Sequence, residues 1–144
     1  MGTTTLKALC NDSNGFSIYT IGASNNTEGN NKLISSVSNQ YDIATGTAIS
    51  GNISNWAMKL TPVTGTYTPT MTEGYNNQYV AVPDIWTKVA SRTSNTDVST
   101  DSDVAGSALT TTYSLYASPA QPAGTYTGQV KYVLIHPNSG AMNL

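Results

Sequence analysis

Hydrophobic and polar residues take alternate positions along the last long segment of the chain, residues 124–137. A period of two predicts a half-buried β-strand, because successive side chains of a strand point to opposite faces of its sheet. Pro137 ends the pattern, since proline has no N–H to donate to a neighbouring strand. We expect a central strand here, passing through the core. Its two predicted faces carry Tyr126, Val130, Tyr132 and Leu134 on one side and Thr127, Gln129, Lys131 and Val133 on the other.

The same alternation marks two segments near the N-terminus, residues 3–10 and 16–22. Between them lies the sequence N-D-S-N-G, in which Asn14 and Gly15 supply the positive φ angles of a tight turn. We therefore expect residues 3–22 to form a β-hairpin. Its first strand begins almost at the first residue of the sequence, so we expect an edge strand that is either exposed or has lost a neighbour.

Shorter alternating segments fill the rest of the chain, separated by residues that favour turns. The loops at 62–77 and 92–106 are long enough for crossings between sheets, and residues 107–136 form either a second long hairpin or such a crossing. About six to nine short strands without an amphipathic helix predict an all-β fold, an antiparallel β-sandwich of the Ig-like or Greek-key kind. The additional strands are expected at residues 33–37, 43–49, 56–61, 78–82, 85–91 and 107–117.

A length of 144 residues suits one domain with a core of its own. We expect residues 1–144 to form a single β-sandwich domain. The first residues, Met1-Gly2-Thr3, show neither the charged region nor the apolar region of a signal peptide. If the protein is exported, this chain is therefore a mature or excised piece that lacks upstream residues.

Charged residues make up only 10% of the chain, against ~25% in an ordinary domain. Hydroxyl and amide side chains take their place on the predicted solvent-facing positions. The formal net charge of -2 provides no basic surface, which argues against a nucleic-acid partner. No apolar stretch approaches the ~20 residues of a membrane-spanning helix. This composition is common among exported bacterial surface proteins, so we expect an extracellular or cell-surface location.

The segment S-P-A-Q-P-A-G-T-Y-T-G-Q-V-K-Y-V-L, residues 118–134, resembles the closing strand of secreted β-sandwich subunits of the spore-coat-protein-U and fimbrial type. Residues 6–19 and 54–60 are similar to a wider group of exported bacterial surface proteins of uncharacterised function. The resemblance implies a surface-associated or assembly-forming domain without enzymatic activity. This chain has only Cys10, so it differs from the disulfide-bonded fimbrial subunits. The difference argues against assembly by donor-strand exchange.

Cys10 cannot form an internal disulfide, since it is the only cysteine. It alternates with Leu6 and Ala8, which favours a small buried hydrophobic residue. A reactive thiol and a disulfide to a segment outside this chain remain alternatives.

No set of residues predicts a catalytic, cofactor or metal site. His136 is the only histidine and lies at the end of the terminal strand, where a structural role is favoured over a catalytic triad. One histidine and one cysteine are too few for a transition-metal site. Asp97, Asp101 and Asp103 carry oxygens that suit calcium, but they lack the EF-hand spacing and are typical of a solvated loop. We expect a protein that is not an enzyme and has no cofactor.

An intramolecular isopeptide bond needs a buried lysine next to Asn or Asp and an acid. Lys7, Lys59 and Lys131 lie on the polar sides of their predicted strands. Lys88 shares its face with Trp86, so it is the one candidate for such a crosslink.

Tyr67, Tyr75 and Tyr79 cluster in a region rich in Asn, Thr and Gly, where aromatic faces and amides could bind a sugar. Closing the end of the sandwich is the alternative role for these rings.

Two functions follow. The first is a non-catalytic extracellular structural or adhesive module of a bacterial surface protein or filament, which pairs with other surface-protein chains or with itself through edge strands. The second is a carbohydrate-binding module that uses the three tyrosines.

Overall fold

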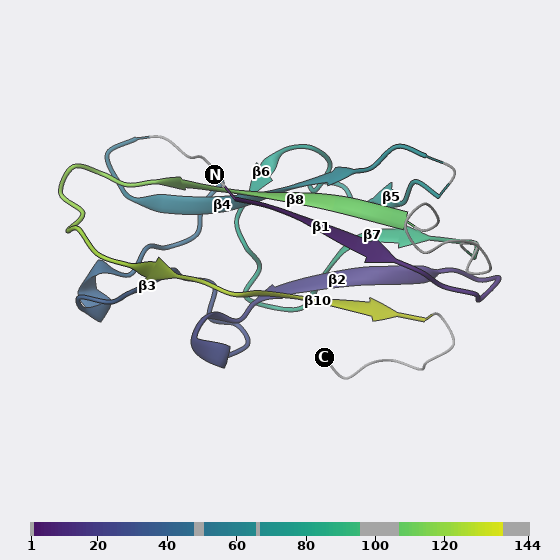
Figure 1. The fold of residues 1–144 in the computed structure, drawn as a ribbon, viewed down its shortest axis with the longest axis horizontal. Helices are drawn as coiled ribbons and strands as arrows, with labels where there is room; N and C mark the ends of the chain where they lie inside the picture. The colour runs from purple at the N-terminus through teal and green to yellow at the C-terminus, as the bar shows by residue number, and fades with distance from the viewer. Residues whose placement is uncertain (1, 48–50, 66, 96–106, 137–144) are drawn as a thin grey trace.

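A computed structural model of the protein describes residues 2–47, 51–65, 67–95 and 107–136 (Figure 1). The acidic segment with Asp97, Asp101 and Asp103 lies outside the described residues, as do Met1 and the end of the predicted strand 43–49.

Two four-stranded antiparallel sheets lie face to face, as Figure 1 shows, so the fold is an all-β sandwich. The first sheet has the order β1-β8-β4-β6 and the second the order β10-β2-β7-β5. A small third sheet joins β3 to β9, and two short 3-10 helices, η1 and η2, lie in the loops. The bounds are β1 Gly2–Ala8, β2 Phe16–Gly22, η1 Ser24–Asn26, β3 Ile34–Ser35, η2 Asn39–Tyr41, β4 Asn55–Pro62, β5 Thr70–Met71, β6 Tyr79–Val80, β7 Thr87–Arg92, β8 Ser107–Tyr116, β9 Tyr126–Thr127 and β10 Val130–Ile135.

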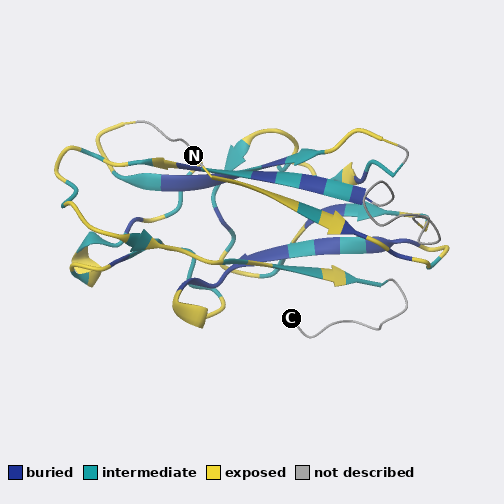
Figure 2. Cartoon of the chain, in the orientation of Figure 1, coloured by how far each residue is buried: buried dark blue, intermediate teal, exposed yellow. Residues whose placement is uncertain are grey.

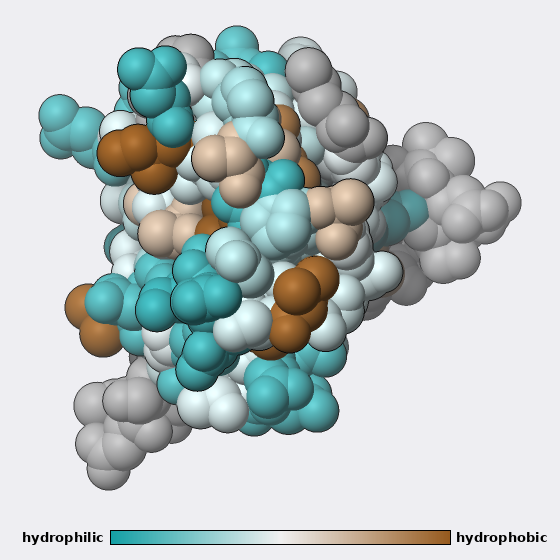
Figure 3. All heavy atoms as spheres, turned by 90° about the vertical axis from the view of Figure 1, so that its left-hand side faces the viewer, coloured by the Kyte–Doolittle hydropathy of each residue, from teal (hydrophilic) through white to brown (hydrophobic). Residues whose placement is uncertain are grey.

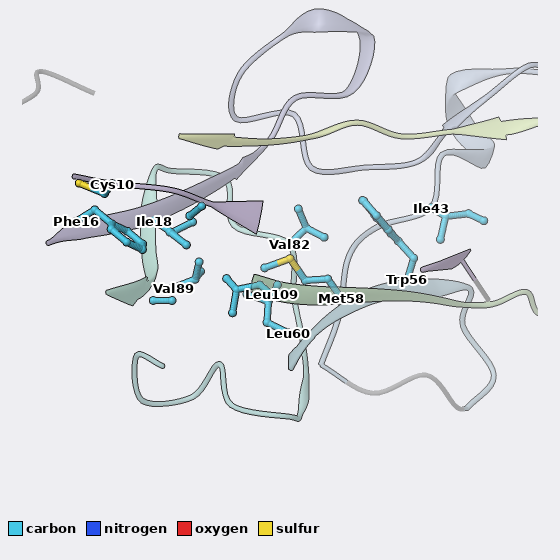
Figure 4. Close-up of a cluster of buried hydrophobic side chains, with 12 residues drawn as sticks. Cys10, Phe16, Ile18, Ile43, Trp56, Met58, Leu60, Val82, Val89 and Leu109 are labelled. Atoms are coloured by element: carbon cyan, nitrogen blue, oxygen red, sulfur yellow. The ribbon is translucent and has the colours of Figure 1, made fainter. Parts of the chain in front are cut away.

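The core lies between the two sheets and is built by every second residue of the long strands (Figure 4). Trp56, Met58 and Leu60 of β4 are buried, for example, while the lysine between the last two is only half-buried. This matches the two-residue period of the sequence. The largest fully buried apolar side chains are Phe16, Ile18, Ile43, Met58, Leu60, Leu109, Val82 and Val89.

The predicted hairpin of residues 3–22 is wrong, although both of its strands and its turn exist. β1 pairs with β8 in the first sheet, and β2 lies between β10 and β7 in the second. The turn makes the chain cross from one sheet to the other, with the Gly15 N–H donating to the Asp12 carbonyl at 3.0 Å. Turn residues determine where the chain reverses, but strands distant in sequence determine the pairing. Residues 107–136 are likewise a crossing rather than a hairpin, because β8 and β10 belong to different sheets.

The last strand, β10, is an edge strand and not the central strand that its pattern suggested. Alternation reports that one face of a strand is more buried than the other; it does not report how many neighbours the strand has. Figure 2 shows the difference from the inner strands, since β10 has no buried residue at all.

Tyr126 fixes the crossing that leads into β10. Its hydroxyl donates to the Pro122 carbonyl four residues earlier, at 2.7 Å, and accepts a hydrogen bond from Gln121 Nε2 at 2.9 Å. Gln121 Nε2 also donates to the Tyr41 carbonyl at 2.7 Å. The Q-P-A-G-T-Y segment is therefore a turn closed by its own tyrosine and tied to the loop at η2.

We expect Gly15→Ala to unfold the protein at lower temperature. Gly15 has a φ of 78°, and an added Cβ would lie 1.9 Å from the Arg92 carbonyl oxygen. Positive φ and a clash with backbone together should lower the free energy of unfolding by about 2 kcal/mol or more, measured by urea denaturation. Gly65→Ala is the matched control, because a Cβ there meets nothing within 4 Å. Equal stability of the two variants would contradict the described turn.

Candidate functional site

The three tyrosines predicted to bind glycans have separate neighbours. The guanidinium carbon of Arg92 lies 5.1 Å from the centroid of the Tyr67 ring, and Lys59 Nζ lies 5.2 Å from that of Tyr79. Tyr75 packs against the core, and burial raises the pKa of its phenol. All three rings are half-buried. Cationic side chains and core residues thus occupy faces that a sugar would use, and the glycan-binding role stays a prediction.

Lys88 is exposed, so it lacks the desolvation that an isopeptide-forming lysine needs. The remaining four lysines, all within the described residues, are not buried either; Lys59 is half-buried and Lys7, Lys32 and Lys131 are exposed. Trp86, the neighbour of Lys88 in the sequence-based argument, is half-buried and its Nε1 donates to Glu28 Oε2 at 3.2 Å. The Glu28 carboxylate also pairs with Lys131 Nζ at 3.0 Å. This contact, followed by the Trp86 hydrogen bond, holds the pKa of the Glu28 carboxyl below its ordinary value.

Cys10 is buried in the core, as its alternation predicted. Its Sγ donates to the Gly15 carbonyl at 3.5 Å, within the turn between the sheets. A disulfide to a segment outside this chain stays open.

His136 forms an ion pair with Asp12, which ties the end of β10 to the turn between β1 and β2. Asp12 Oδ1 also accepts the Asn14 N–H at 2.6 Å. That backbone hydrogen bond, followed by the His136 contact, holds the pKa of the Asp12 carboxyl below its ordinary value. The histidine therefore makes a link between two strand ends, the kind of structural role that its position suggested.

The described part of the chain contains no group of three or more His, Cys, Asp or Glu residues placed to hold a metal ion. Its helices also lack the length and hydropathy needed to cross a lipid bilayer.

In the described part of the chain, the two sheets leave inward-facing residues uncovered along one side, which we call the open margin and define by the edge strands β1 and β10. Thr4 and Leu6 of β1 are opposite Thr111 and Leu109, so they point toward the second sheet, yet Thr4 is exposed and Leu6 half-buried. Leu134, on the inward face of β10, is 40% exposed. Inner residues are therefore left uncovered on both strands.

A cleft of about 500 Å³ lies at one end of the open margin. It lies between the start of β1 and the end of β8 in the first sheet and the start of β10 in the second. None of the described residues that line it is charged. Its apolar walls are Leu33, Trp56, Tyr113, Leu115 and Val130.

Three hydroxyl groups join the sheets beside this cleft. The Tyr132 hydroxyl of β10 lies 3.0 Å from Thr111 Oγ1 and 3.2 Å from the Tyr113 hydroxyl, both of β8. Burial, followed by the nearby Tyr132 phenol, raises the pKa of Tyr113 far above its ordinary value. The phenol therefore stays neutral at physiological pH, and the bridge is one of uncharged hydrogen bonds.

Sequence reasoning missed the cleft, although it predicted the strands at 56–61 and 107–117 and the terminal strand, which contribute to its walls. The cleft lies between strands of different sheets, and alternation does not report which strands become the edges of those sheets. Figure 3 shows this end of the molecule, where hydrophobic groups are separated from one another by hydrophilic residues. Comparisons with protein families, with curated protein sequences and with solved structures found no match to the chain. The resemblance of residues 118–134 to spore-coat-protein-U and fimbrial subunits therefore stays a prediction.

Tyr132→Phe should lower the free energy of unfolding by about 1–3 kcal/mol, because it leaves the Thr111 and Tyr113 hydroxyls without their partner. Tyr116→Phe is the control, since Tyr116 is also half-buried and its hydroxyl has no hydrogen bond to the described residues. Urea denaturation of both variants measures the difference. A Tyr132→Phe protein as stable as the control would mean that the hydroxyl bridge does not hold the margin.

Asp12→Ala should make the protein less stable at neutral pH, by an amount that disappears on acidification. The folded-state pKa of Asp12 lies below its ordinary value of 3.8, so its stabilisation is present above about pH 4 and is lost as the pH falls through the folded pKa. Thermal unfolding from about pH 7 to pH 2 measures the gap between wild type and variant. Asp84→Ala controls for the loss of an exposed carboxylate; a pH-independent gap for Asp12→Ala would contradict the proposed linkage.

Proposed function

We propose that the protein is a non-catalytic, extracellular structural or adhesive module of a bacterial surface protein or filament, which assembles through its free edge strands. The observation that carries the proposal is the outer edge of β1. Residues Gly2 to Thr5 of this strand are all exposed, and among the described strands its backbone pairs with β8 alone. An edge strand of this kind presents N–H and C=O groups on its other side, to which a strand of another chain can pair.

The side chains of β1 support pairing rather than protection. Natural edge strands avoid association through prolines, inward-pointing charges or bulges. β1 has the sequence G-T-T-T-L-K-A, with a single lysine near its end and no proline, and it pairs with β8 in unbroken register. Threonine also has a high β-propensity, so a strand added here would meet a favourable row of side chains.

The surface chemistry supports an extracellular location. Hydroxyl and amide groups in place of charges satisfy many backbone groups, as with the Thr45 hydroxyl, which donates to the Trp56 carbonyl and accepts the Val82 N–H. A reaction site is not part of the proposal, because the titratable groups with a described partner, such as Asp12 with His136 and Glu28 with Lys131, serve as links between strands or loops.

The test is a pair of proline substitutions at adjacent residues, Thr3→Pro and Thr4→Pro. Successive N–H groups of a strand point to opposite sides, so one of these residues donates to β8 and the other toward the free edge. Proline at the residue whose N–H donates to β8 should lower the melting temperature, because it disrupts the sheet. Proline at the residue whose N–H faces the free edge should leave the melting temperature nearly unchanged. The stable variant has then lost only an outward N–H.

Sedimentation velocity over a wide range of protein concentrations measures assembly. We expect the wild type to associate as concentration rises and the stable proline variant to remain monomeric. A wild type that stays strictly monomeric at high concentration, or a stable variant that associates as well as the wild type, would refute assembly through β1.

A further inference from the structure

The cleft lies beside the last residues of β8, past the part of that strand that pairs with β1 in the described residues. β1 pairs with β8 as far as the Gly2–Tyr113 pair, whereas β8 continues to Tyr116 against β4. The Tyr113 side chain points toward the second sheet, because its hydroxyl contacts that of Tyr132. The Leu115 side chain lies on the same face of β8 as Tyr113, since the two residues are two positions apart in a strand. Leu115 is thus an inward-facing leucine, yet it is 48% exposed.

Two glycines shape the cleft in opposite ways. Gly128 lets the segment between β9 and β10 approach Leu33 and Trp56 closely, because a Cβ there would lie 2.5 Å from Leu33 Cδ2 and 3.5 Å from the Trp56 ring. Gly2 leaves the mouth open, because a Cβ there would meet nothing within 4 Å. Gly2 is directly opposite Tyr113, so a side chain at this position would point into the cleft.

The geometry points to a binding site for a single small, neutral molecule with a flat apolar ring. A volume of about 500 Å³ is within the range of small-molecule pockets. The walls include the rings of Trp56 and Tyr113, whose centroids are 6.3 Å apart with a tilt of 31°. The described residues of the lining carry no charge, which selects against ions, since a charge buried without a partner is strongly destabilised.

Indole is the probe for this site, because it is neutral, flat and largely apolar. Titration into the ¹⁵N-labelled protein, followed by amide chemical shifts, should give saturable changes at Leu33, Trp56, Leu115 and Val130, with a dissociation constant on the order of 1 mM. Indole-3-acetate carries the same ring with a carboxylate and should bind at least about tenfold more weakly.

Gly2→Leu should fill the mouth of the cleft and weaken indole binding at least about tenfold. Gly65→Leu is the matched control, because a Cβ there also meets nothing within 4 Å, and it should bind indole as the wild type does. Leu115→Ser provides a second variant in case Gly2→Leu does not fold: it removes an apolar wall at an exposed position and should also weaken binding.

The same titrations identify the results that would overturn the proposal. The first is that indole causes no change in the amide chemical shifts at the cleft. The second is that both cleft variants bind indole as tightly as the wild type does, and the third is that indole and indole-3-acetate bind equally well. Shift changes at the cleft that follow protein concentration without indole would show a second copy of the chain as the occupant. If cellobiose changes the shifts of the same amides and indole does not, the ligand of the cleft is polar. Occupation by a second copy and binding of a polar ligand would each contradict an apolar small-molecule site.

Discussion

Burial of one face of each sheet against the other is the constraint on which the structure depends. Met58, Leu60 and Leu109 of the first sheet and Phe16 and Ile18 of the second are almost completely buried, so the centre of the sandwich is closed. The same constraint fails along the open margin, where β1 and β10 have no further neighbours among the described strands. There the sheets are joined by the hydroxyls of Tyr132, Thr111 and Tyr113. The features with functional interest, the free edge and the cleft, lie where apolar closure ends.

A chain with few charges must satisfy its polar backbone in other ways, and amide and hydroxyl side chains do so here. Trp56 Nε1 donates to the Asn31 carbonyl at 3.0 Å, and Asn31 Nδ2 donates to the Val82 carbonyl at 2.8 Å. The Thr45 hydroxyl accepts the Val82 N–H at 2.7 Å. These bonds join three loops to β4 without an ion pair. Salt screens surface ion pairs much more than neutral hydrogen bonds. The stability that these hydrogen bonds provide should therefore depend little on salt concentration.

The sequence predicted the class of fold and most strands, because alternation is a local property. β4 and β8 were found within a few residues of their bounds, and Cys10 was correctly expected to be buried. Pairing was harder, since Asn14 and Gly15 signal a reversal of the chain in a hairpin and in a crossing between sheets alike. The cleft could not be predicted at all: Leu115 continues the inward face of β8, and alternation does not reveal that this leucine is 48% exposed.

Amide hydrogen exchange along β1 tests the central claim, an uncovered edge on an otherwise closed sandwich, most directly. At low protein concentration we predict that alternate amides of Gly2–Ala8 exchange slowly, through bonds to β8, and that the amides between them exchange quickly because they face solvent. The central amides of β4 and β8, with neighbours on both sides, should all be slow. Uniformly slow exchange along β1 would mean that its outer edge is covered, and it would contradict the open margin.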